Sequence, residues 1–168
     1  MYRLLGNEVL DTEELGKHVE SETGLRVRED ISNATKRDDA AALRLELDIS
    51  ILGYDDTLKY EDEQIMNELM AKSDEYARAE LKAVISHFGE YLAYDVYSYS
   101  FDEVSNCTLL VMAVMSTENS HRKKKDGNKR LLTKKQKNID NKLIITVLRS
   151  IQMPSWHLFF YLKLIMTV

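Results

Sequence analysis

The stretch LRLELDISI, residues 43–51, alternates apolar and polar side chains along its whole length and decides the fold class. Leucine or isoleucine occupies every odd-numbered position, and Arg44, Glu46, Asp48 and Ser50 occupy the even-numbered ones. Because successive side chains of a β-strand point to opposite faces, this pattern predicts a strand with one buried and one open side. The buried side must then be covered by other elements of the chain.

Helix signals flank this strand on both sides. Asp11 followed by Glu14 has the spacing of a capping box, and Gly24 is suited to end the helix that starts there. A second helix is expected from Glu61–Glu63, whose carboxylates suit a positive helix end, to Gly89. Its apolar face is predicted to contain Met66, Met70, Ala77, Leu81, Val84 and Phe88.

Four further segments have strand character: residues 1–5, 25–29, 91–101 and 107–115. The expected order is β-α-β-β-α-β with one additional strand, which forms a hairpin with the strand before it. This order resembles the ferredoxin-like split βαβ arrangement and predicts an α+β fold. The resemblance implies no function, because this architecture carries many.

The charge of the chain is divided unevenly. Residues 1–116 hold 11 Lys/Arg and 25 Asp/Glu, a net charge of −14, whereas residues 117–168 hold 12 and 3, a net charge of +9. We therefore expect an acidic α+β domain (1–116), a basic linker (117–142) and an apolar C-terminal segment (143–168). Arg149, Pro154 and Lys163 interrupt the apolar segment, so a spanning helix is not expected there.

The sequence gives no positive support for an enzyme. It contains no glycine-rich phosphate loop, no GxSxG and no HExxH motif, and nothing indicates a cofactor or a bound metal. His18 and His87 lie on the two predicted helices and are interpreted as structural or exposed histidines. The lone Cys107 begins an apolar strand, which predicts a buried thiol, and one cysteine is typical of a reducing, cytoplasmic setting.

The open face of the predicted sheet is a first candidate surface. If the helices cover the leucine row, then Arg26, Arg28 and Arg44 point away from them, with Arg3 as a further member. Tyr97 and Tyr99 share this face if their strand buries Leu92, Tyr94 and Val96 on the opposite side. Arginine interleaved with tyrosine suits phosphates and stacked bases. In the competing interpretation the arginines form cross-strand ion pairs with Glu46 and Asp48, and the tyrosines are ordinary strand residues.

The basic segment is a second candidate surface and suggests a nucleic-acid-associated binding protein. Its cations are Arg122, Lys123, Lys124, Lys125, Lys129, Arg130, Lys134, Lys135 and Lys137. The aromatic residues of 156–161 allow a peripheral membrane contact as a less favoured alternative. Two other interpretations stay open: the segment folds back on the acidic domain, or it is foreign to that domain.

The acidic domain itself is the third candidate. Its carboxylates can take the place of phosphates and occupy a basic cleft of a partner protein, with electrostatic steering of the encounter. The residues expected to contribute lie at the entry to the second helix: Asp55, Asp56, Glu61, Asp62 and Glu63. The competing interpretation is that the acidic charge serves solubility alone.

Overall fold

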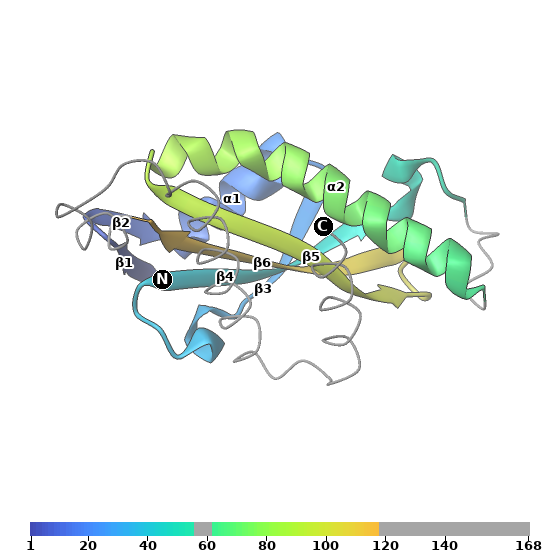
Figure 1. Cartoon of the computed structure of the whole chain (residues 1–168), viewed down its shortest axis with the longest axis horizontal. Coiled ribbons are helices and arrows are strands. Elements are labelled where there is room, and N and C mark those ends of the chain that lie inside the picture. The colour runs from blue at the N-terminus through green and yellow to red at the C-terminus, as the bar shows by residue number, and fades with distance from the viewer. Residues whose placement is uncertain (56–61, 118–168) are drawn as a thin grey trace, which may run out of the picture.

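Strand β4 (Ala40–Asp48) contains most of the alternating stretch and lies inside a four-stranded sheet in the computed structural model, which describes residues 1–55 and 62–117. These described residues form an α+β fold with two sheets and two α-helices (Figure 1). The other elements are β1 (Tyr2–Leu5), β2 (Glu8–Asp11), α1 (Thr12–Glu22), β3 (Leu25–Asp30), α2 (Glu63–Phe88), β5 (Leu92–Asp102), β6 (Cys107–Ser116) and the 3₁₀ helices η1 (Ser32–Thr35) and η2 (Ile49–Leu52).

The main sheet has the strand order β3-β4-β6-β5, and every neighbouring pair is antiparallel. Because β4 and β5 are both antiparallel to β6, they run parallel to each other, with α2 as the crossover between them. The hairpin predicted for residues 102–106 joins β5 to β6, and Asn106 adopts a left-handed conformation at its end (φ 53°). Strand β6 lies between β4 and β5 in the sheet, and α2 crosses over it to connect these two strands.

Both α-helices cover the same face of the main sheet (Figure 1). The leucine row of β4 is buried there, together with Leu110 and Met112 of β6 and the inner sides of both helices. On α2 the buried residues are Leu69, Ser73, Ala77, Leu81, Val84 and Ile85. The predicted face is therefore confirmed at Ala77, Leu81 and Val84, whereas Met66, Met70 and Phe88 are only half-buried.

The caps of both helices follow from short polar side chains. Asp11 begins α1 and accepts a hydrogen bond from the backbone N–H of Glu13, as its position in the sequence predicts. Asp62 begins α2 and accepts from the N–H groups of Gln64 and Ile65. These carboxylates satisfy backbone donors that the first helical turn leaves without partners.

The ferredoxin-like order is not confirmed. Strand β1 does not join the main sheet but pairs with β2, a strand that the sequence did not predict, in a separate two-stranded sheet. Gly6 (φ 70°) at the first position of the two-residue turn permits this tight hairpin. The segment before Asp11 therefore forms a second strand rather than a loop leading to the helix.

The predicted strand 43–51 is displaced toward the N-terminus. It starts at Ala40, and Ile49–Leu52 form η2 instead of continuing the sheet. Asp48 accepts a hydrogen bond from Ser50 N–H (2.9 Å), and Gly53 (φ 80°) closes the turn in a left-handed conformation. Ile51, expected on the buried face, is 44% exposed as a result.

The other face of the main sheet has a charged half and an apolar half. Arg26, Arg28 and Arg44 lie toward β3, whereas a second buried cluster lies toward the β4–β6 pair. That cluster contains Ile31, Ala40, Ala42, Val111, Ala113 and Met115. Among the described residues, no helix is long and apolar enough to cross a membrane.

Candidate functional site

The arginines of the open sheet face are held in ion pairs. Glu46 lies 3.2 Å from Arg28 and 3.7 Å from Arg26, and Glu29 lies 2.7 Å from Arg44. The register of β3 shifts at a bulge between Val27 and Glu29. Arg26 therefore lies opposite Glu46, and Glu29 lies opposite Arg44. The competing interpretation, in which the arginines form cross-strand ion pairs, therefore holds for Glu46. The negative charge of Glu46 and Glu29 opposes the binding of a phosphate to the same guanidinium groups.

Asp48, the other expected partner, has a different role. Its carboxylate accepts from Ser50 at the start of η2, and these hydrogen bonds hold the pKa of Asp48 below its usual value. The ion pairs of the open face therefore involve Glu29 in place of Asp48. Sequence alternation could not identify Glu29, because the β-bulge changes the face to which β3 residues point.

Tyr97 and Tyr99 pack half-buried against the second apolar cluster. Tyr97 lies opposite Val111 in the β5–β6 ladder. Burial raises the pKa of the Tyr99 hydroxyl. Both rings thus contribute to packing on the face where the sequence placed them.

Arg3 is not part of this face, which corrects the sequence-based expectation. It is 8% exposed and donates hydrogen bonds to the carbonyl oxygen of Arg37 (3.1 Å) and to Oδ1 of Asn33 (2.6 Å). Since β1 belongs to the small sheet, Arg3 points into the loop around η1 and connects that sheet to it. Its role is structural.

The predicted acidic residues are only partly described. Asp55 and Glu63 are exposed, and the carboxylate of Asp62 caps α2. Asp56 and Glu61 lie outside the described residues, as do all nine cations of the basic segment. The structure therefore gives no geometry for that segment.

The two helices form an acidic layer, a term we use for α1 and α2 together. Their sequences hold nine Asp/Glu and four Lys/Arg. Lys17 pairs with Glu13 and Lys72 pairs with Glu68, each at 2.8 Å. Glu14, Glu63 and Glu75 are exposed and make no ion pair within residues 1–55 and 62–117. Within the part of the chain that the structure describes, the layer thus presents an excess of negative charge to solvent.

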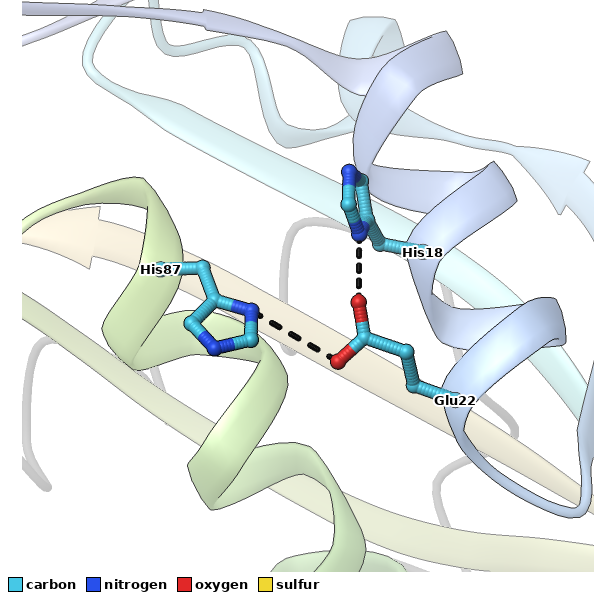
Figure 2. A group of neighbouring side chains, drawn as sticks. All are labelled: His18, Glu22 and His87. Carbon is cyan, nitrogen blue, oxygen red and sulfur yellow. Dashed lines mark hydrogen bonds and ion pairs between the residues drawn. The ribbon is translucent and has the colours of Figure 1, made fainter.

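A second group of side chains on this layer was not found from the sequence. Glu22 of α1 lies between His18 of the same helix and His87 of α2 (Figure 2). Its Oε1 is 2.5 Å from Nδ1 of His18, and its Oε2 is 3.5 Å from Nδ1 of His87. The ring of His18 also packs edge-on against Phe88, with 5.3 Å between the centroids. We call His18, Glu22 and His87 the His–Glu–His cluster.

Only two of the three members of this cluster can be connected from the sequence. His18 and Glu22 are four residues apart, a spacing that places both side chains on one face of a helix. His87 joins them only because α1 and α2 lie side by side on the sheet. Two imidazoles and a carboxylate are a donor set that suits borderline divalent metals.

Asp74 on α2 is a largely buried carboxyl group that faces strand β5. It accepts hydrogen bonds from the backbone N–H of Ser98 (2.5 Å) and from the Ser98 hydroxyl (2.6 Å). Desolvation nevertheless raises the pKa of Asp74, since its hydrogen bonds only partly compensate for burial. These contacts attach α2 to the irregular part of β5, between Ser98 and Ser100.

Comparison with known proteins gives no relative. No protein-family model, curated protein or solved structure matches this chain.

Proposed function

We propose that the protein is a non-enzymatic interaction protein whose acidic layer binds a basic surface of a partner protein. The observation that carries the proposal is the charge of the layer: nine Asp/Glu against four Lys/Arg, with Glu14, Glu63 and Glu75 exposed and unpaired among the described residues. The opposite face of the sheet is balanced, because its arginines lie in ion pairs. A single cysteine fits action in a reducing, cytoplasmic setting.

The charge of the acidic layer is expected to act mainly on the rate of association with a partner. Exposed charges of one sign raise the rate of encounter with an oppositely charged partner more than they raise the final affinity. The effect is screened by salt within about 8 Å at physiological ionic strength. A steered complex therefore forms more slowly as salt is added.

The test is an affinity capture with the full chain, followed by association kinetics on the recovered partner. Glu63→Gln/Glu75→Gln removes two charges from α2, and Asp38→Asn/Glu103→Gln removes two exposed charges elsewhere. We expect the first variant to lower the on-rate about threefold or more and to weaken its salt dependence. Equal on-rates for the two variants would assign the effect to net charge and remove the acidic layer as the binding surface.

A second candidate function is binding of nucleic acid through the basic segment. The observation in its favour is the density of cations in residues 120–138, nine Lys/Arg and one Asp. The ion pairs of Arg26, Arg28 and Arg44 leave this segment as the main candidate contact with phosphates. Lys123→Gln/Lys124→Gln/Lys125→Gln in the full chain is expected to weaken DNA and RNA binding and to reduce the slope of log K against log salt by about 3. Unchanged binding would exclude this candidate.

A further inference from the structure

The His–Glu–His cluster brings three potential metal donors together from two helices. Its ligand atoms, one from each side chain, all lie within 4.8 Å of one another. Around tetrahedral zinc, with bonds of about 2.0–2.1 Å, donor atoms are separated by roughly 3.3 Å. Small rotations about the side-chain bonds of these partly exposed residues close that difference.

The position of the cluster on the helices also favours a cation. Glu22 is the last residue of α1, and His87 lies in the last turn of α2. The C-terminal end of a helix carries a partial negative charge, and here two such ends meet at one place. The acidic layer around them adds to the attraction.

We propose that His18, Glu22 and His87 bind a Zn²⁺-class divalent cation that connects the C-terminal end of α1 to that of α2. Each histidine supplies one ring nitrogen and Glu22 supplies carboxylate oxygen, which leaves a coordination position for water. Two imidazole ligands favour Zn²⁺ over the oxygen-seeking ions Mg²⁺ and Ca²⁺. The packing of Phe88 against the ring of His18 limits the freedom of that ligand before the metal arrives.

This site is independent of the proposed interaction with a basic partner. A bound cation lowers the negative charge of the acidic layer, yet the two ideas are tested on different residues. Glu63 and Glu75 do not belong to the cluster, so a failure of either proposal leaves the other intact.

Calorimetric titration of the chelator-treated full chain with Zn²⁺ and with Mg²⁺ tests the site. The expected result is one Zn²⁺ per chain and no binding of Mg²⁺ at the same concentration. His18→Ala, His87→Ala and Glu22→Gln are expected to weaken Zn²⁺ binding by about tenfold or more. His121→Ala/His157→Ala replaces the remaining two histidines of the sequence and serves as the matched control, with unchanged affinity.

A second measurement needs no substitution. In the wild-type chain, the ring NMR signals of His18 and His87 are expected to shift together as Zn²⁺ is added, up to one equivalent. Absence of Zn²⁺ binding by the wild-type chain would overturn the proposal. So would wild-type Zn²⁺ affinity in the His18→Ala or the His87→Ala variant, or loss of binding in the His121→Ala/His157→Ala control.

Discussion

Asp74 offers the sharpest test of how the helix layer is attached to the sheet. Its side chain is 19% exposed and accepts two hydrogen bonds from Ser98, while Arg78 lies 3.8 Å away. Asp74→Ala removes both acceptor contacts and leaves the N–H of Ser98 without its partner at the edge of β5. Asp74→Asn keeps one side-chain oxygen that can still accept from Ser98.

The magnitude follows from these contacts. A hydrogen bond to a charged group contributes about 1.5–3 kcal/mol, and a buried donor that loses its acceptor costs about 1–3 kcal/mol. Removal of an unfavourably buried charge offsets part of this loss. We therefore expect Asp74→Ala to lower the free energy of unfolding by about 2–3 kcal/mol, and Asp74→Asn by about 1 kcal/mol or less.

Urea unfolding followed by circular dichroism measures this difference. A loss of about 2 kcal/mol lowers the Tm of a domain of this size by roughly 10 °C. The neighbouring exposed Glu75 provides the control, since Glu75→Ala is expected to change stability by less than about 0.5 kcal/mol. If Asp74→Ala and Glu75→Ala behave alike, the Ser98 contacts do not stabilise the fold.

The raised pKa of Asp74 also fixes the sign of a pH effect. Since burial raises this pKa in the folded chain, the folded state binds a proton more readily than the unfolded state at mildly acidic pH. The associated stability is present below the unfolded pKa and is lost as pH rises through the folded pKa. We expect the stability of the wild type relative to Asp74→Asn to decrease as the pH rises from about 4, the ordinary pKa of an aspartate, through mildly acidic values. An increase over this window would contradict the burial argument.

Three further substitutions test separate parts of the fold. Leu81→Ala, at a fully buried position of α2, is expected to cost about 2–5 kcal/mol in urea unfolding, and a loss below about 1 kcal/mol would place Leu81 outside the core. Arg3→Ala should cost about 2–3 kcal/mol through the lost contacts to Asn33 and Arg37, while Arg3→Met should recover part of this by packing; no loss in either variant would refute the structural role. Asp62→Ala removes the cap of α2 and should cost about 1 kcal/mol, with Asp62→Asn close to wild type; equal losses would argue against capping.

The α+β class and most elements could be predicted from local patterns. Alternation identified β4, a capping aspartate identified the start of α1, and helical spacing identified Ala77, Leu81 and Val84 as core residues. The hairpin between β5 and β6 followed from two apolar runs joined by a short polar turn. In each case neighbouring residues carry the information, so a single sequence is sufficient.

Features that depend on distant contacts could not be predicted in this way. The missed pairing of β1 with β2 is a local exception, since Gly6 supports a tight turn that removes β1 from the main sheet. The bulge in β3 changed the partner of Arg44 to Glu29. His87 approaches Glu22 only through the packing of α1 beside α2, and no local pattern encodes that approach.

The most direct test of the proposed function compares two charge variants of the full chain in one affinity capture. Glu63→Gln/Glu75→Gln weakens the acidic layer, and Lys123→Gln/Lys124→Gln/Lys125→Gln weakens the basic segment. Both captures are made with nuclease treatment, at low and at raised salt. We predict a basic protein partner that the first variant and raised salt deplete, and that the second variant retains. The account is contradicted if the glutamate variant recovers the partner as well as the wild type does, while nuclease or the lysine variant abolishes recovery. That result would favour nucleic-acid binding.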